Sequence, residues 1–292
     1  MPRWRGASGV TPFDLVVPAT VDDAIASLRG GEGSGTVVIA GGTDLLLDLD
    51  AGRLAPRRVV SLRRLPWRTL DWVEGSLTIG STLPLRSLEE DPELRRRLPG
   101  LWQAVRAVGS AALRHRATIG GNLGRSAPSS DLVPILLVLD AEVELVGPRG
   151  HRRLSVDRFV RASRRTALEP DELIRSVRVP ESRPSAYLWQ RVRPANDISQ
   201  IAAAAAFSPA ARAWSVAVGG LSPRPLLLPG VGTVLGRDAP TSERIRAAGE
   251  KAKEEVPNVG DRRASEEYRR RLIGTLVERA VRAAGPSEGG SG

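Results

Sequence analysis

The chain has 292 residues, of which 41% are hydrophobic, and a formal net charge of +10. This length fits about two domains, and the hydrophobic fraction is sufficient for a buried core. The sequence contains no cysteine, so the chain itself can hold no iron–sulfur cluster, thiolate zinc site or disulfide.

The positive charge comes almost entirely from arginine. The arginines stand in twos and threes between acidic residues, and only 4% of residues are aromatic. The net charge is therefore the only feature that favours a nucleic-acid-binding protein. The two histidines, His115 and His151, are too few for most metal sites, and we expect His151 to be exposed in a loop. No hydrophobic run reaches the ~18 residues of a membrane span, and the first ten residues lack the hydrophobic segment of a signal peptide. We therefore expect a cytoplasmic protein.

The first part of the chain alternates short strands and helices. Thr20 should cap a helix over residues 21–29, because hydrophobic residues recur behind it at helical spacing. A short strand at 13–18 precedes this helix, and a buried strand at 37–40 follows it. Further strands are expected at 58–62, 70–73 and 77–80, the last two as a hairpin, and helices at 82–89, 92–98 and 101–108.

The second part begins with a hydrophobic helix at 132–139, where Pro134 lies in the first turn and is tolerated. The composition changes at residues 180–185, which indicates a linker. Strands are expected at 142–146, 173–179, 186–192, 201–207, 213–219 and 224–228, and amphipathic helices at 241–255 and 265–284. The residues from 285 onward are polar, and we expect them to be disordered.

Two glycine-rich stretches follow strands or helices where a simple turn needs only one glycine. The first is at residues 40–44 and the second runs from Thr118 to Asp131. Glycine has no Cβ, so its backbone adopts positive φ and approaches other groups closely, and unpaired N–H groups in such turns bind anions. We expect the second stretch to be neither a helix nor a strand. Either stretch alone is equally consistent with a plain turn, but the pair suggests two cradles for one extended, phosphate-bearing ligand.

Three motifs resemble the FAD-binding medium subunit of the molybdenum hydroxylases, the xanthine dehydrogenase and carbon monoxide dehydrogenase family. They are Ala-Gly-Gly-Thr-Asp-Leu-Leu at 40–46, the run from Arg114 to Asn122 that ends in Thr-Ile-Gly-Gly-Asn, and Ser-Ala-Pro-Ser-Ser-Asp at 126–131. Further similarity at 172–180, 197–198 and 267–270 extends the resemblance over nearly the whole chain. It implies an α+β fold with a two-subdomain FAD-binding module of the PCMH (vanillyl-alcohol-oxidase-like) type over residues 1–179, divided near residue 57. A smaller α+β C-terminal domain would follow over residues 180–284.

The resemblance also implies which residues bind FAD, and it implies no catalytic residue and no metal ligand. Asp131 would accept hydrogen bonds from sugar hydroxyls, and Ile174 would pack against the adenine or the flavin edge. The isoalloxazine ring would lie near Val108 and Gly109, with Ile198 on its other face. The diphosphate and part of the ribityl chain would lie between Thr118, Gly121 and Asn122 on one side and Val38, Ile39, Ala40, Gly41, Gly42, Thr43, Asp44 and Leu45 on the other.

Two positions depart from the family pattern. Trp189 stands where many relatives have a basic residue, and it either stacks on a ring or packs in the core. Arg125 stands where relatives more often have a small residue, and it either touches a phosphate or faces solvent.

The function implied by the resemblance is electron transfer through FAD. A large partner subunit would carry the molybdenum cofactor and a small one the [2Fe-2S] clusters, and the electron acceptor would be NAD, oxygen or a quinone. The absence of cysteine agrees with clusters held elsewhere. The alternative is a self-contained FAD-dependent oxidase or reductase of the same fold, which needs an acid or base beside the flavin. The arginines at 95–97 and 269–271 either face an acidic partner or form solvated helix faces.

Overall fold

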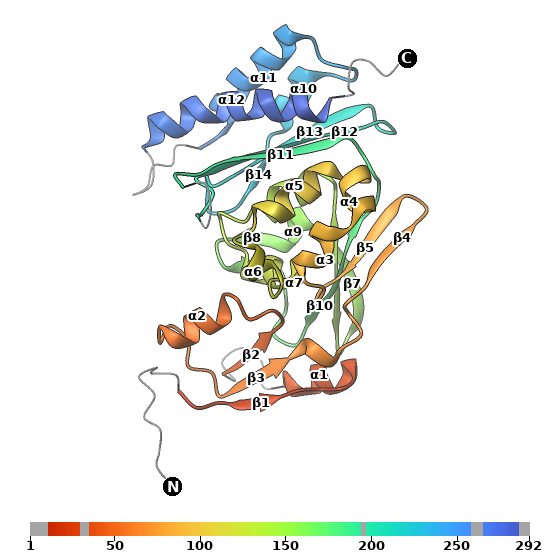
Figure 1. The fold of residues 1–292 in the computed structure, drawn as a ribbon, viewed down its shortest axis with the longest axis vertical. Helices are drawn as coiled ribbons and strands as arrows, with labels where there is room; N and C mark the ends of the chain where they lie inside the picture. Colours follow the sequence, from red (N-terminus) through yellow and green to blue (C-terminus); the bar gives the residue numbers. More distant parts are fainter. Residues whose placement is uncertain (1–10, 30–34, 194–196, 258–264, 286–292) are drawn as a thin grey trace.

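The computed structural model describes residues 11–29, 35–193, 197–257 and 265–285. Its elements form three bodies stacked along the long axis of the molecule, with the N-terminal body at the lower end of Figure 1 and the C-terminal body at the upper end. Each body is built on its own main sheet. No helix within these ranges has the length and hydrophobicity that a membrane span requires.

The N-terminal body is a parallel three-stranded sheet of order β1-β3-β2 with two short helices. Thr20 caps the first helix as predicted, because its Oγ1 accepts the N–H of Asp23 at 3.1 Å. Its elements are β1 (Asp14–Val16), α1 (Val21–Ser27), β2 (Thr36–Ile39), α2 (Leu45–Asp50) and β3 (Arg58–Ser61).

Two expectations for this body are wrong. The division between subdomains was placed near residue 57, but β3 begins at Arg58 and is the central strand of the first sheet. The strand before the first glycine stretch was expected to be buried, but β2 lies at the sheet edge and Val38 is 37% exposed. A run of β-branched residues shows a strand, but it does not show how many neighbours cover that strand.

The middle body is an antiparallel five-stranded sheet of order β4-β5-β10-β6-β7, with helices packed against it. The predicted hairpin is confirmed as β4 and β5. His151 is exposed as expected, but it lies in strand β7 rather than in a loop. The strands are β4 (Leu70–Val73), β5 (Ser76–Gly80), β6 (Glu142–Gly147), β7 (Gly150–Ser155), the small pair β8 (Val160–Ala162) and β9 (Arg165–Thr166), and β10 (Leu173–Val179). The helices are η1 (Leu62–Arg64), α3 (Leu85–Glu90), α4 (Pro92–Arg97), α5 (Pro99–Ala107), α6 (Ala111–Arg114), α7 (Ile119–Arg125), α8 (Leu132–Val138) and α9 (Val156–Phe159).

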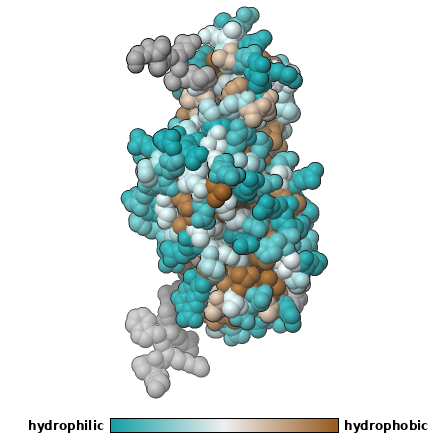
Figure 2. Space-filling model, turned by 90° about the vertical axis from the view of Figure 1, so that its right-hand side faces the viewer, coloured by the Kyte–Doolittle hydropathy of each residue, from teal (hydrophilic) through white to brown (hydrophobic). Residues whose placement is uncertain are grey.

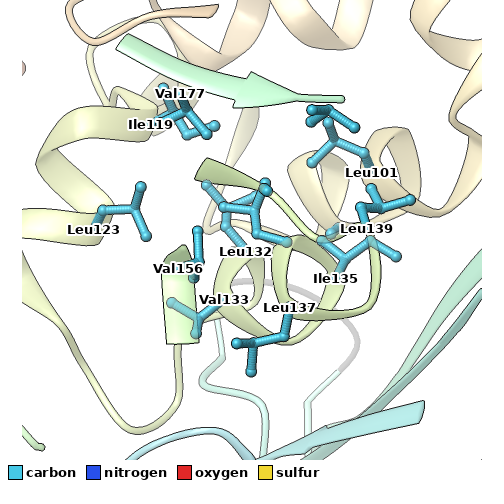
Figure 3. Close-up of a cluster of buried hydrophobic side chains, with 14 of the residues drawn as sticks. Leu101, Ile119, Leu123, Leu132, Val133, Ile135, Leu137, Leu139, Val156 and Val177 are labelled. Atoms are coloured by element: carbon cyan, nitrogen blue, oxygen red, sulfur yellow. The ribbon is translucent and has the colours of Figure 1, made fainter. Parts of the chain in front are cut away.

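The core of the middle body surrounds α8, in which all seven residues are buried. Figure 3 shows side chains of α8 meeting Leu101 of α5, Ile119 and Leu123 of α7, and Val177 of β10. A helix that is hydrophobic on every face must be covered on every side. This explains why α8 lies at the centre of the body.

The C-terminal body is a four-stranded antiparallel sheet of order β11-β12-β13-β14. Helices α10 to α12 cover its outer face, and α5 and α8 of the middle body lie on its inner face (Figure 1). The elements are β11 (Ser185–Gln190), β12 (Ile201–Ser208), β13 (Ala213–Gly219), β14 (Leu226–Leu227), α10 (Pro229–Leu235), α11 (Ser242–Glu255) and α12 (Glu266–Ala284). Of the tail that was expected to be disordered, only Gly285 is among the described residues.

Strand β12 joins the middle and C-terminal cores. Successive side chains of a strand point to opposite faces, so Ala202, Ala204 and Ala206 pack in the core of the middle body, whereas Ala203 and Ala205 pack in that of the C-terminal body. Alanine keeps both faces flat enough for helices to pack closely on each side. The alanine run therefore marks a strand that is buried on both faces.

The second glycine stretch contains a helix, so the expectation that it is irregular is wrong. Thr118 caps α7 by accepting the N–H of Gly121 at 3.0 Å, and Ser126 ends it in the left-handed conformation with φ of +48°. A glycine inside a helix costs about 1 kcal/mol relative to alanine, but Ile119 and Leu123 of the same helix are fully buried. Tertiary packing therefore overrides the poor helix propensity of this segment.

Arg125 at the end of α7 pairs with two carboxylates, and its side chain is 24% exposed. Its Nη1 lies 2.5 Å from Oδ2 of Asp48, and its Nε lies 3.9 Å from Asp44, so it joins α7 to α2. Asp48 is buried and also accepts from Arg53 at 2.6 Å. The hydrogen bonds from Arg125 and then Arg53 lower the pKa of Asp48 below its ordinary value of 3.8.

The surface on the side opposite to α2 is largely hydrophilic. Figure 2 shows hydrophobic residues scattered among polar ones there, with a broader hydrophobic area toward the end that carries the N-terminal body. Scattered exposed hydrophobic residues are normal on a folded protein.

Arg125→Met should destabilise the folded chain. The variant leaves the buried Asp48 with one arginine instead of two, and a hydrogen bond to a charged group contributes about 1.5–3 kcal/mol. Because the folded-state pKa of Asp48 is depressed, its contribution is present above its ordinary pKa of 3.8 and is lost as the pH falls through the lower folded value. Urea unfolding at pH 7 should therefore show a loss that shrinks at pH 3.

The matched control is Arg149→Met, which removes an exposed pair with Asp171. Exposed pairs contribute about 0–1 kcal/mol. If the two variants lose the same stability at pH 7, the Arg125–Asp48 contact is not a structural link between α7 and α2.

Candidate functional site

The first glycine stretch turns from β2 into α2 and presents free backbone amides. The turn occurs at Gly42, which has φ of +81°, a conformation that favours glycine. Within the described ranges, the N–H groups of Gly42, Thr43 and Asp44 donate no hydrogen bond. Unpaired amides in such a turn are donors of the kind that bind anions, and a phosphate at this turn stays a prediction.

The first glycine stretch touches the backbone of the segment just before the second one. A Cβ on Gly41 would lie 2.0 Å from the carbonyl oxygen of Arg116, closer than any side chain permits. The Nε of Arg116 in turn donates to the carbonyl of Gly41 at 3.4 Å. Only glycine at position 41 permits this close contact with Arg116, which lies two residues before Thr118.

The amides of Gly120, Gly121 and Asn122 are already paired, which corrects the expectation that this turn leaves consecutive amides free. The N–H of Gly120 donates to the carbonyl of Ser81, and that of Asn122 to the carbonyl of Thr118. The N–H of Gly121 donates to Oγ1 of Thr118. This stretch therefore contributes shape rather than a row of backbone donors.

Gly121 fits close approach by a ligand. It is exposed on α7, and a Cβ there would meet only Oγ1 of Thr118, at 3.0 Å. An exposed helical glycine costs about 1 kcal/mol relative to alanine, and the only contact that opposes a side chain here is the tight one with the hydroxyl of Thr118. Gly120, by contrast, is required by the protein, because a Cβ there would lie 2.7 Å from the carbonyl oxygen of Ser81.

The sequence also suggests that a side chain at Gly42 would block a bound phosphate, and the direction of its Cβ corrects this expectation. A Cβ there would point at the side chains of Ile39 and Leu46, at 3.1 and 3.4 Å, and not outward. Substitution of Gly42 would act through its positive φ rather than by blocking a phosphate. Val38 is 37% exposed beside this turn, so a hydrophobic surface borders the free amides.

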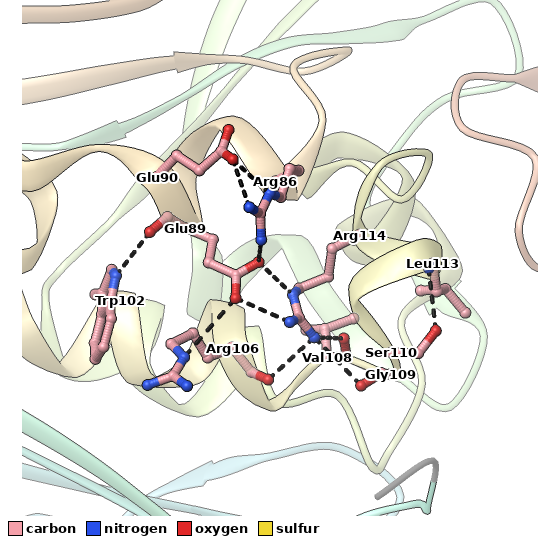
Figure 4. Close-up of polar contacts among 10 residues, drawn as sticks. All are labelled: Arg86, Glu89, Glu90, Trp102, Arg106, Val108, Gly109, Ser110, Leu113 and Arg114. Carbon is pink, nitrogen blue, oxygen red and sulfur yellow. Dashed lines mark hydrogen bonds and ion pairs between the residues drawn. The ribbon is translucent and has the colours of Figure 1, made fainter.

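Val108 and Gly109 form the segment after α5, and a buried arginine holds its carbonyls. Nη1 of Arg114 donates to the carbonyls of Arg106, Val108 and Gly109 at 3.3, 3.1 and 3.3 Å (Figure 4). Nε and Nη2 of Arg114 bind the carboxylate of Glu89 at 2.8 and 2.9 Å. The hydrogen bond from Arg114 lowers the pKa of Glu89, so the pair is ionised at neutral pH.

Asp131 lies at the junction with the C-terminal body. Its Oδ1 accepts from Tyr187 Oη at 2.7 Å and from Ser199 Oγ at 2.6 Å, and its Oδ2 lies 3.4 Å from Arg191 Nη2. Burial raises the pKa of Asp131, against hydrogen bonds from Ser199 and Tyr187 that lower it, and burial raises the pKa of Tyr187 well above its ordinary range. A carboxylate offers about four acceptor positions, so Oδ2 retains room for one more donor. The sugar contact stays a prediction for this atom.

The remaining predicted residues differ in exposure. Ile198 is 45% exposed, whereas Ile174 is 7% exposed and packs in the core of the middle body. Oδ1 of Asn122 accepts from Ser130 Oγ at 2.6 Å. Trp189 is half-buried and packs against the core, where it stacks on Tyr187 with ring centroids 5.7 Å apart, and its stacking on a flavin ring stays a prediction.

These segments come together from distant parts of the sequence. Figure 1 shows α2 and α6 on the same side of the molecule. Arg116 contacts Gly41, Arg125 joins α7 to α2, and Arg191 joins the end of β11 to α5. A groove of about 880 Å³ between α1 and the β6–β7 turn lies elsewhere and contains none of the predicted residues. No group of three or more potential metal ligands occurs in the described part of the chain.

Sequence reasoning missed Arg114, Arg191, Tyr187 and Ser199 as parts of this site. The chain has 43 lysine and arginine residues, so no single arginine stands out. The only signal was that Arg114 begins the run leading into the second glycine motif. Neither the burial of these side chains nor their partners can be inferred from local sequence.

Comparison with known proteins agrees with this geometry. The family of FAD-binding domains in molybdopterin dehydrogenases matches residues 11–182, and the CO dehydrogenase flavoprotein C-terminal domain matches residues 186–284. The xanthine dehydrogenase FAD-binding subunit of Escherichia coli O157:H7 is 31% identical, over 93% of this chain and 96% of that protein. The nicotine 6-hydroxylase medium subunit of Paenarthrobacter nicotinovorans is 30% identical, over 92% and 95%.

Solved structures show the same fold. The carbon monoxide dehydrogenase of Hydrogenophaga pseudoflava contains a chain that superposes with a TM-score of 0.86 and 25% identity, covering 94% of this chain and 98% of that one. The similarity thus spans all three bodies described above. The chain belongs to the family of FAD-binding subunits of the molybdopterin dehydrogenases.

Proposed function

We propose that this chain is the FAD-binding electron-transfer subunit of a heterotrimeric molybdenum hydroxylase. Electrons from [2Fe-2S] clusters on a small partner subunit would pass through FAD to an external acceptor, NAD, oxygen or a quinone. The observation that carries the proposal is the row of free amides at Gly42, Thr43 and Asp44, in a chain of this family whose Gly41 lies against the backbone just before α7.

The diphosphate end of FAD is assigned to the two glycine stretches. The amides of Gly42, Thr43 and Asp44 would bind phosphate oxygens, because oriented N–H groups replace water around an anion. Gly121 and Asn122 would line the opposite side, with the Thr118 cap holding their turn in place. Arg125 holds the two sides together through Asp48, rather than binding the phosphate itself.

The ring end of FAD is assigned to the segment after α5. Val108 and Gly109 would lie beside the isoalloxazine, and the exposed Ile198 would cover its other face. Ile174 and Trp189 would contact the adenine or the edge of the flavin ring through the exposed part of each side chain. When bound, FAD takes up single electrons and releases them in pairs, which is chemistry of the cofactor and not of this chain.

The partner subunits follow from the chemistry that this chain lacks. It contains no cysteine, so clusters must be held by another chain. The molybdenum cofactor is assigned to a large subunit. The same proposal divides the chain into an FAD-binding domain over residues 1–179 and a C-terminal domain over residues 180–284. The cytoplasmic location stays a prediction.

The alternative, a self-contained FAD oxidase or reductase, needs an acid or base at the flavin. Tyr187 lies in the right region, but its hydroxyl is fully buried and donates to Asp131. His115 is exposed at the end of α6. No observation favours this alternative.

The subunit proposal predicts that the purified single chain binds FAD and oxidises no purine, aldehyde or heteroaromatic compound. Co-expression with its partner subunits should yield a complex that contains molybdenum and iron by metal analysis and has full turnover. Full turnover by the single chain, with both metals shown to be absent, would falsify the subunit proposal in favour of the self-contained enzyme.

Gly121→Ala should weaken FAD binding while the apoprotein keeps its stability. A methyl group in a closely packed contact costs about 1–3 kcal/mol, so the Kd for FAD should rise roughly tenfold to hundredfold. The stability of the apoprotein should stay within about 1 kcal/mol of the wild type. Fluorescence titration and urea unfolding measure the two effects.

Gly124→Ala is the matched control in the same helix. Its added Cβ would make an ordinary contact with Ile174 at 3.7 Å, and Gly124 is not among the proposed FAD residues. Equal Kd values for the two variants would contradict the placement of FAD against Gly121.

Asp131→Asn tests the proposed sugar contact. If Oδ2 accepts a ribityl or ribose hydroxyl, FAD binding should weaken by about 1.5–3 kcal/mol, the contribution of a hydrogen bond to a charged group. Tyr187→Phe is the comparison, because it removes one donor to Oδ1 and leaves Oδ2 untouched. Titration should show the larger loss for Asp131→Asn, and equal losses would assign Asp131 a purely structural role.

A further inference from the structure

Two buried guanidinium groups hold four consecutive carbonyls at the end of α5. Arg114 binds those of Arg106, Val108 and Gly109, and Nη2 of Arg191 binds that of Ala107. Each guanidinium is itself fixed. Arg114 is 9% exposed and lies on Glu89, whereas Arg191 is 8% exposed and contacts Ser199 at 3.3 Å and Asp131 at 3.4 Å.

This arrangement fixes the direction of the neighbouring amides. In a planar trans peptide the carbonyl of one residue and the N–H of the next point in opposite directions. The carbonyls of Val108 and Gly109 point at Arg114, so the N–H groups of Gly109 and Ser110 point away from it (Figure 4). The φ of Gly109, +52°, permits this geometry.

These two amides have no acceptor within the described residues. The N–H of Val108 donates to the carbonyl of Val105, but no such bond occurs for Gly109 or Ser110 in that part of the chain. Both residues are half-buried. A half-buried N–H group that has no acceptor in the protein is available to a ligand.

We propose that Arg114 and Arg191 are positioning residues that aim the amides of Gly109 and Ser110 at acceptor atoms of the flavin ring. The inference rests on the proposed function, in which the ring lies beside Val108 and Gly109. Reduction places negative charge on the ring, and fixed donors stabilise an anion more than a neutral acceptor. The chain therefore binds reduced FAD more tightly than oxidised FAD.

The C-terminal body has a direct part in this arrangement. Arg191 follows β11, and Arg114 belongs to α6 of the middle body, so the segment is held from two bodies at once. Arg191 also lies over the ring of Trp189, 5.4 Å from its centroid, which restricts the guanidinium further. Docking of the C-terminal sheet thus completes the ring site.

The experiment compares Arg114→Lys and Arg191→Lys with wild type in the full chain. Lysine keeps the charge but has a single amino group, so it cannot hold several carbonyls in a fixed plane. We expect the preference for reduced over oxidised FAD, obtained from the reduction potential and the Kd for oxidised FAD, to fall about tenfold, or about 30 mV for a two-electron couple. The infrared carbonyl band of isotopically labelled FAD should shift to higher frequency as these hydrogen bonds weaken.

Arg86→Met is the matched control. Arg86 binds the same Glu89 from the exposed side but contacts none of the four carbonyls. It should leave the affinity ratio and the carbonyl band unchanged.

The outcomes separate this inference from the proposed function. Lysine variants that bind FAD with the wild-type ratio and carbonyl frequency, whatever their unfolding temperatures, overturn the positioning role and leave FAD binding intact. Two variants from different bodies are used so that a folding defect in one does not remove the test. A wild-type chain that binds no FAD overturns both proposals.

Discussion

The candidate site depends on two places where backbone meets backbone without intervening side chains. Gly41 lies against the carbonyl of Arg116, and Gly120 lies against Ser81. A Cβ at either place would lie well inside contact distance, so the neighbouring backbone would have to move. The first contact brings the turn after β2 to the segment before α7, and the second holds the first turn of α7 against Ser81, the residue after β5. The proposed diphosphate site, with its free amides and the exposed Gly121, depends on both contacts.

The charged groups around the site contribute mainly to holding it in shape. Arg125 connects α7 to α2 through the buried Asp48, and Arg114 connects α6 to α3 through Glu89. Buried ion pairs gain little net stability relative to hydrophobic contacts, but removing one partner is costly. Such pairs therefore make the geometry specific. This distribution of arginine is consistent with the proposal that the phosphates of FAD are bound chiefly by backbone amides.

The predictions from sequence were most successful where a regular pattern had one structural solution. The helix capped by Thr20, the β4–β5 hairpin and the alanine-rich strand β12 were all confirmed. The errors arose where packing decided the outcome. Residues 119–125 form a helix in spite of three glycines, because Ile119 and Leu123 are buried in the core. Strand β3 lies in the first sheet because parallel neighbours, which are distant in sequence, pair with it.

The sequence by itself determined the family, the two glycine motifs and the absence of any cysteine ligand, because these are properties of residue type and spacing. It could not distinguish the two glycine stretches, of which one offers free amides and the other offers an exposed Gly121. Only the tertiary structure decided that Arg114 and Arg191 hold the carbonyls beside Gly109, and that Tyr187 and Ser199 surround Asp131. The physical reason is that hydrogen bonds of side chains between distant segments depend on how the three bodies pack, and that packing is not encoded in any local pattern.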